Sequence, residues 1–152
     1  MDAAAIYLAL PVPDRAEHLW RYTPWHRIHP TGNTADLPTD SSPALLSLTL
    51  LDGSEVPEGI TLEVAEQVES IAAHDDIAAS FIRAVTAGNA ATLSVDKGVR
   101  VEQPLLLEIE AEGELCGVHL NHNFGSGSEI ELITVVKGDV AWLGLLREGV
   151  VK

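Results

Sequence analysis

The sequence has little positive charge, one cysteine and few aromatic residues. It holds 9 Lys and Arg against 23 Asp and Glu, which gives a formal net charge of −14. Such an acidic chain would repel the phosphates of a nucleic acid, so we expect no nucleic-acid partner. The single cysteine, Cys116, excludes an internal disulfide framework and fits a reducing compartment.

Long apolar runs and enzyme fingerprints are also missing. The apolar run from Ala3 to Leu10 follows Asp2 rather than basic residues and is far shorter than the roughly 20 residues of a membrane span. Neither a Gly-x-Ser-x-Gly elbow nor a phosphate-binding loop of the Gly-x-x-x-x-Gly-Lys-Ser/Thr type occurs. We therefore predict a soluble, cytoplasmic, non-enzymatic protein without a membrane partner.

What the chain does have is enough apolar material for a core. With 152 residues and a hydrophobic fraction of 46%, it can form one domain, or one domain with an arm. Its charges are unevenly distributed. No Lys or Arg lies between Arg27 and Arg83, but ten acidic residues lie between Asp36 and Asp76, both included. A solvated acidic face, a salt-adapted proteome and a basic partner all account for this stretch.

Three zones follow one another along the chain. In residues 1–44, Asp14 is a plausible N-cap for a short helix through Trp20, Pro24 would stop it, and a Pro-rich and Gly-containing loop follows. In residues 45–89, the pattern predicts a strand at 45–51, a helix beginning at Thr61 and a second helix beginning at Asp75 or Asp76. Gly88 is placed to cap the second helix.

In residues 90–152 the pattern changes to short strands rich in Val, Ile and Leu. The expected strands are 92–95, 99–101, 105–109, 115–120, 130–136 and 140–146, with turn residues between them. This spacing fits a sandwich, a small barrel or a β-solenoid, and periodicity alone does not choose among them. The fold class is therefore α+β and mostly β.

A Cys-x-x-His-x-x-His pattern places three metal-ligating side-chain types close together, at Cys116, His119 and His122. On a strand, Cys116 and His122 share one face and His119 points to the other, so one ion cannot reach all three without a bulge. The alternative interpretation is a buried cysteine with packed or surface histidines. A cupin-like metal-binding barrel would instead use His119, His122 and Glu131, although the spacing departs from the cupin motif and no second histidine motif follows.

Aromatic residues concentrate in the segment Glu17–Trp25, which holds two of the three tryptophans and one of the two tyrosines. Trp, Tyr and Arg dominate binding hot spots, so Trp20, Tyr22 and Trp25 are candidate partner-binding residues. Docking of this segment on the protein's own body explains the pattern equally well.

Two segments carry a family resemblance. Glu17–Thr23 is similar to the Trp-Arg/Lys-Tyr-Thr segment of the SufB/SufD family of iron–sulfur cluster assembly proteins, and Phe81–Ile109 resembles that family's step from a helix into its first strands. Within the second segment, Gly98-Val99, Glu102 and Pro104-Leu105 match the family's turn and Glu-x-Pro step, and 127–134 resembles the rungs that follow. The chain is closer to SufD than to SufB.

The resemblance implies a short right-handed parallel β-helix, or β-solenoid, preceded by a helical N-terminal region. It also implies a SufB-like scaffold and a SufC-like ATPase as partners, with no resident cofactor beyond a transient iron–sulfur cluster. The family's later turns and C-terminal region are not in this sequence, so no functional residue is carried over. Both a short relative and a fragment of a longer protein fit the sequence.

The end of such a solenoid leaves strand edges unpaired. The apolar stretch Val140–Val151 is a candidate for such an edge, and Trp142 within it is a further candidate partner-binding residue. We expect self-association to cover it, so a structural homo-oligomer is another possible role.

Overall fold

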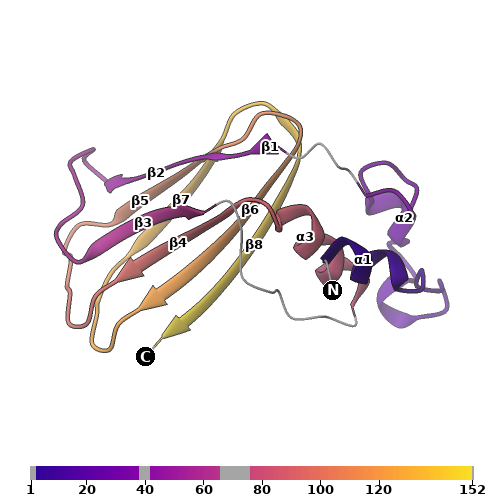
Figure 1. Ribbon diagram of the computed structural model, residues 1–152, viewed down its shortest axis with the longest axis horizontal. Coiled ribbons are helices and arrows are strands. Elements are labelled where there is room, and N and C mark those ends of the chain that lie inside the picture. The colour runs from indigo at the N-terminus through magenta and orange to yellow at the C-terminus, as the bar shows by residue number, and fades with distance from the viewer. Residues whose placement is uncertain (1–2, 38–41, 66–75, 152) are drawn as a thin grey trace.

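The computed structural model describes residues 3–37, 42–65 and 76–151, and it places a layer of helices at one end of two β-sheets (Figure 1). The helical segments are α1 (Ala3–Ala9), the 3₁₀ turn η1 (His18–Trp20), α2 (Trp25–Ile28) and α3 (Ile77–Thr86). The strands are β1 (Ser42–Pro43), β2 (Leu45–Leu50), β3 (Ile60–Ala65), β4 (Ala90–Val95), β5 (Leu105–Glu110), β6 (Gly113–Phe124), β7 (Leu132–Lys137) and β8 (Val140–Val151). The expected α+β, mostly β class is confirmed.

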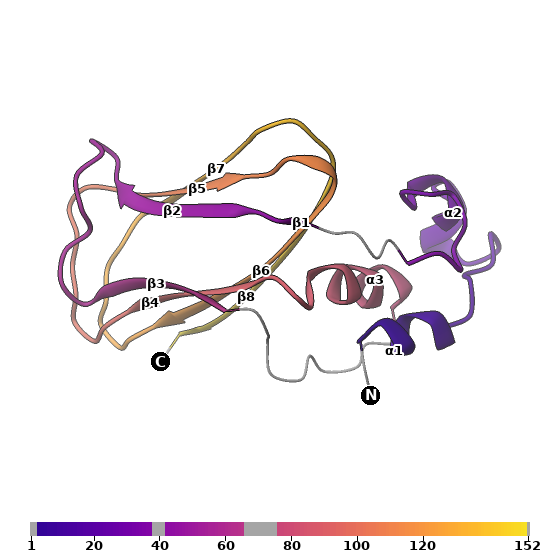
Figure 2. The same ribbon diagram turned by 45° about the horizontal axis from the view of Figure 1, so that its top comes forward.

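The two sheets lie as separate layers (Figure 2). In the five-stranded sheet, β6 lies between β8 on one side and β4 with β1 on the other, and β3 pairs with β4. The three-stranded sheet has the order β2-β5-β7. From β4 to β8 the chain crosses from one sheet to the other with each successive strand.

Strands that follow this alternation pair in parallel. β4 and β8 both run parallel to β6, and β7 runs parallel to β5. Leu105 is in register with Leu132 and Gly113 with Val140, so both pairs are separated by the same number of residues. An antiparallel barrel would join neighbouring strands in opposite directions, so this pairing differs from the barrel alternative.

The apolar core lies between the sheets because every second residue of the strands points inward. In β5 the inward residues Leu105, Leu107 and Ile109 are fully buried, at 0% exposure, and alternate with partly exposed neighbours. Leu120 from β6 packs against Leu107 and Ile109. Five of the six strands that the Val-, Ile- and Leu-rich pattern predicts after residue 90 are therefore present, as β4 to β8.

The helix predicted from Thr61 is wrong over its described part. Residues Ile60–Ala65 form β3, which pairs antiparallel with β4 along its whole length. Ile60 and Leu62 pack into the core while Val64 is 70% exposed at the end of the strand. Ile60, Leu62 and Val64 alternate as strand residues do, whereas the helix prediction took its apolar spacing from Val64 onward. The rest of that predicted helix lies outside the described residues.

Three further expectations differ in detail. The Asp14 carboxylate accepts a hydrogen bond from the Ala16 N–H, as an N-cap residue does, but the chain after it makes only the 3₁₀ turn η1 and not the predicted helix through Trp20. Pro24 does not end helical structure but precedes α2, where its missing N–H is not needed. The expected strand 99–101 is reduced to an isolated bridge from Arg100 to Glu129.

The second predicted helix is confirmed with its cap. In α3 the Asp76 side chain accepts a hydrogen bond from the Ala79 N–H at 2.9 Å, as an N-cap residue does. The helix ends at Thr86, so Gly88 lies beyond its C-cap residue, Ala87. Within the described part of the chain, no helix has the length and apolar character needed to cross a membrane.

Candidate functional site

The three predicted metal ligands all lie on β6, and the structure separates them. Cys116 is fully buried, and burial raises the pKa of its thiol. His119 is also buried but lies on the sheet face opposite to Cys116 and His122. In the ranges 3–37, 42–65 and 76–151, no group of three His, Cys, Asp or Glu side chains is placed to hold a metal ion.

His119 belongs to a polar link between β6, β8 and α3. Its Nε2 lies 3.1 Å from Oε2 of Glu148, and the other carboxylate oxygen, Oε1, accepts a hydrogen bond from Arg83 at 3.0 Å. The His119 ring is only 1% exposed, whereas Glu148 is 43% exposed. The link therefore connects α3 to β8, and the buried polar partner of His119 is Glu148.

His122 has a different environment. Its Nε2 accepts a hydrogen bond from the Arg147 guanidinium at 3.2 Å, and its ring stacks on Phe124. Burial, and then the neighbouring Arg147 charge, lower the pKa of His122. Glu131, the third residue of the cupin alternative, is exposed and lies just before β7. The structure does not bring it together with the two histidines as one group.

The aromatic candidates, in contrast, come together in part. Trp25 is 4% exposed and lies in an edge-to-face cluster with Trp20 at 5.5 Å and with Phe81 of α3 at 5.6 Å between ring centroids. Tyr22, between the two tryptophans in sequence, is 83% exposed. The segment is therefore docked on the protein's own body through Trp25, while Tyr22 remains available to a partner.

Trp25 and the fourth candidate, Trp142, line one apolar groove of about 230 Å³. The groove lies between α2, α3 and the outer face of β8, and Trp142 is 42% exposed at its rim. Its full lining is Trp25, Ile28, Pro30, Ala78, Phe81, Ile82, Val85, Leu115, Trp142, Leu143 and Gly144. A concave apolar surface of this kind suits an apolar side chain of another molecule.

Reasoning from the sequence missed the α3 part of this groove as a binding surface. The apolar face of the predicted helix did contain Phe81 and Val85, but a helix must bury one face in any fold. The pairing of β6 with β8 sets Leu115 opposite Trp142. Only this pairing places the apolar face of α3 beside Trp142.

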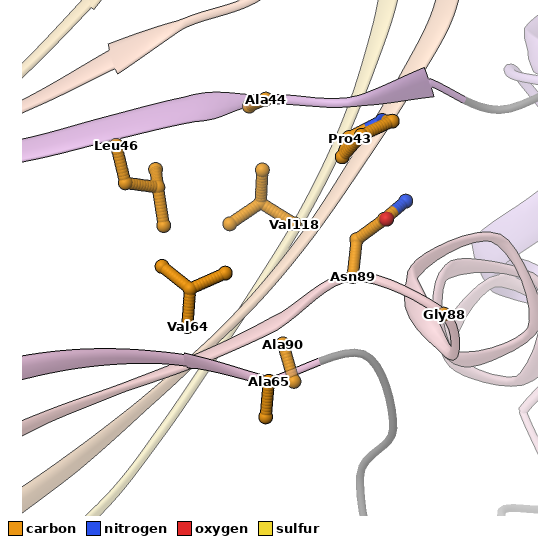
Figure 3. A pocket seen from close by; sticks show the side chains of 9 residues that line it. All are labelled: Pro43, Ala44, Leu46, Val64, Ala65, Gly88, Asn89, Ala90 and Val118. Carbon is orange, nitrogen blue, oxygen red and sulfur yellow. The ribbon is translucent and has the colours of Figure 1, made fainter.

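A second cavity, of about 390 Å³, opens between the sheets near β1 and the start of β4 (Figure 3). Small and apolar residues dominate its lining, which is Pro43, Ala44, Leu46, Val64, Ala65, Gly88, Asn89, Ala90 and Val118. Among the described residues that define it, no acid, base or nucleophile is present. The cavity therefore offers apolar contact and the single polar side chain of Asn89.

Comparison of the chain with family models, with curated proteins and with solved structures gave no match.

Proposed function

We propose that this chain is a SufD-like component or accessory of iron–sulfur cluster assembly that acts through protein–protein contacts and not as an enzyme. In this proposal the strands from β4 onward form a short right-handed parallel β-helix. A SufB-like scaffold and a SufC-like ATPase are its partners. Any iron–sulfur cluster would be cargo in transit.

The observation that carries the proposal is the alternation of the chain between two sheets with parallel pairing within each. β4, β6 and β8 stack in one sheet and β5 and β7 in the other. This is the connectivity of a coil in which each circuit pairs with the previous one. Crossovers between parallel strands are almost always right-handed, which supports a right-handed coil.

The two ends of the proposed coil differ. At its first circuit, β2 pairs antiparallel with β5 and β3 pairs antiparallel with β4, so both sheets are covered there. At its last circuit, β7 and β8 each have one neighbour among the described strands. Unpaired edges with exposed apolar residues such as Val135 and Val150 favour a partner that adds strands.

Co-purification tests the proposal. We expect a tagged chain, co-expressed with a SufB-like scaffold and a SufC-like ATPase, to retain both through affinity and size-exclusion steps. A Val135→Lys substitution should weaken retention of the scaffold, because it places a charge on the β7 edge. Leu45→Lys is the matched control, since Leu45 is 71% exposed on β2 at the opposite edge of the same sheet.

A folded chain that retains neither partner would overturn the proposal. The cupin-like alternative has its own readout in the same preparation, which is made without oxygen. A tightly bound mononuclear metal that disappears when His119 and His122 are both replaced would favour that alternative over the SufD-like role.

A further inference from the structure

The outer edge of β2 is open to another strand. β2 covers β5 on one side, and on its other side it has no partner strand among the described residues. We propose that β2 pairs antiparallel with β2 of a second copy of this chain, across a two-fold axis, so that two three-stranded sheets join into one. The inference stands independently of the role in cluster assembly, because it concerns the chain alone.

The direction of the backbone groups at this edge follows from the pairing of β2 with β5. Leu50 makes its backbone hydrogen bonds with the following loop, since its N–H donates to the Ser54 carbonyl and its carbonyl accepts from the Gly53 N–H. In an antiparallel pair, every second residue points its N–H and C=O away from the neighbouring strand. Leu46 and Leu48 therefore point these groups to the open edge, as Leu50 does, and no strand that the structure describes pairs with them there.

Edge strands usually carry a charge, a proline or a bulge that prevents pairing with another molecule. The other long edge strands of the two sheets are β3, β7 and β8, and each contains charged residues: Glu63 in β3, Lys137 in β7, and Arg147 and Glu148 in β8. The strand Leu45–Leu50 contains neither a charge nor a proline. A second β2 therefore meets no like charge within the paired strands.

The open backbone groups also determine the register. Pairing of Leu46 with Leu48 of the second copy, and of Leu48 with its Leu46, uses the outward N–H and C=O groups of both residues in both copies. A register shifted by two residues would need Leu50, whose groups are already bonded, or Ala44, which lies outside β2. The two copies of Ser47 then lie opposite each other at the two-fold axis.

This register makes β2 its own complement. Directly opposite residues of an antiparallel pair lie on the same face, so Leu46 and Leu48 of both copies stay on the core side. On the outer face, Leu45 lies opposite Thr49 of the second copy. In a two-fold interface the same surface must serve both subunits, and β2 meets this condition without any second segment.

The margin beside β2 is apolar as well. Leu46 of β2 and Val64 of β3 point toward one another across the cavity between the sheets (Figure 3). Leu45 is 71% exposed and Val64 is 70% exposed. A second β2 lays its leucines beside those of the first copy and so removes apolar surface from water. The edge therefore offers backbone hydrogen bonds and apolar contact to the same strand.

The acids nearest to this edge lie one strand further in. Glu108 and Glu110 of β5 both pair with Lys137. Three strand spacings separate Glu108 from Glu108 of the second copy, which is about 14 Å. This distance exceeds the screening length of about 8 Å at physiological salt. Each copy has a net charge of −14, so the dimer should become stronger as salt is added.

Cross-linking of Ser47→Cys tests the pairing and its register. In the proposed dimer the two residues 47 form a non-hydrogen-bonded pair with Cα atoms about 4.5 Å apart, which a disulfide can span. We expect this variant to form a covalent dimer with oxidised glutathione. Thr49→Cys is the matched control, because Thr49 faces Leu45 and not its own counterpart, and it should form no covalent dimer above the wild-type level. The wild type controls for Cys116, which is buried.

Sedimentation velocity measures the dimer without a cross-link. Ser47→Lys places two like charges opposite each other at the axis and should weaken dimerisation by about tenfold or more. Val135→Lys adds the same charge to β7, at the opposite edge of the same sheet, and should leave dimerisation unchanged. Added sodium chloride should strengthen the wild-type dimer. Far-ultraviolet circular dichroism establishes that each variant is folded.

Three results would overturn the proposal. A wild type that stays monomeric at high micromolar concentration, even with added salt, refutes it directly. Equal cross-linking of Ser47→Cys and Thr49→Cys would show random collision in place of a fixed register. A dimer that Ser47→Lys leaves intact would place self-association at another edge or bring an unrelated surface into contact.

Discussion

Replacement of Gly138 by alanine tests how closely the turn between β7 and β8 packs against the segment between β5 and β6. Gly138 lies in the turn between β7 and β8 with φ at +105°, and a Cβ built on it would overlap the carbonyl oxygen of Ala111. Ala111 is fully buried, and its N–H donates a hydrogen bond to the Lys137 carbonyl at 2.9 Å. The turn after β7 therefore rests directly on the segment between β5 and β6.

Two costs are expected for Gly138→Ala. Holding alanine at this positive φ costs about 1–3 kcal/mol. The overlap with Ala111 is with backbone, which cannot rotate away, so overpacking adds about 1–3 kcal/mol. The total of roughly 2–6 kcal/mol is a large part of the 5–15 kcal/mol that stabilises a typical domain.

Gly113→Ala is the matched control. Gly113 has a similar φ, +94°, but nothing lies within 4 Å of a Cβ built there. It should therefore show only the backbone cost of about 1–3 kcal/mol. Urea unfolding followed by tryptophan fluorescence and circular dichroism gives both values. If the two variants lose the same stability within about 0.5 kcal/mol, the close contact between Gly138 and Ala111 is refuted.

Two further substitutions test the helical layer, and one labelling experiment tests the interior of the sheets. Phe81→Ala should cost about 3–5 kcal/mol in urea unfolding, because Phe81 contacts the rings of Tyr7, Trp25 and His29 at the centre of the layer; a loss below 1 kcal/mol would contradict this packing. Burial lowers the pKa of His29 in the folded protein below its value of about 6.5 in the unfolded chain. Between these two pKa values the unfolded chain binds more protons than the folded protein, so the free energy of unfolding is expected to fall as the pH drops below about 6.5. His29→Phe should flatten that part of the stability profile measured by thermal unfolding, and an unchanged slope would refute the assignment. Cys116 should react with a thiol reagent at pH 8 far more slowly in the folded protein than in urea, because its thiol is buried and its pKa is raised; equal rates would show that the β6 interior is open.

Local signals in the sequence were sufficient for the elements that local interactions define. Asp76 begins α3 because its carboxylate caps the first turn, and that capping pattern is readable without a fold. The strands β5, β6, β7 and β8 follow from aliphatic runs between turn residues. Strand periodicity also separates His119 from Cys116 and His122 without coordinates.

Elements that depend on distant partners were not readable in the same way. β3 forms because β4 offers it a ladder along its whole length, and its own strand signal is short, since only Ile60, Leu62 and Val64 alternate. Asp14 makes the hydrogen bond of an N-cap residue, yet the chain beyond it forms only the 3₁₀ turn η1, so the capping signal alone did not determine the length of the helix. The groove unites segments of α2, α3, β6 and β8, so no stretch of sequence contains it.

The position of the groove follows from two glycines that are neighbours only across strands. Gly117 of β6 and Gly144 of β8 are in register, and a Cβ on Gly117 would lie 2.5 Å from the Val85 carbonyl oxygen of α3. A Cβ on Gly144 would lie 3.0 Å from a methyl carbon of the same Val85. The absence of both side chains lets α3 lie directly on the sheet. Because the helix is seated there, its apolar face meets the sheet just beside Leu115 and Trp142, and the surface that this contact leaves uncovered is the groove.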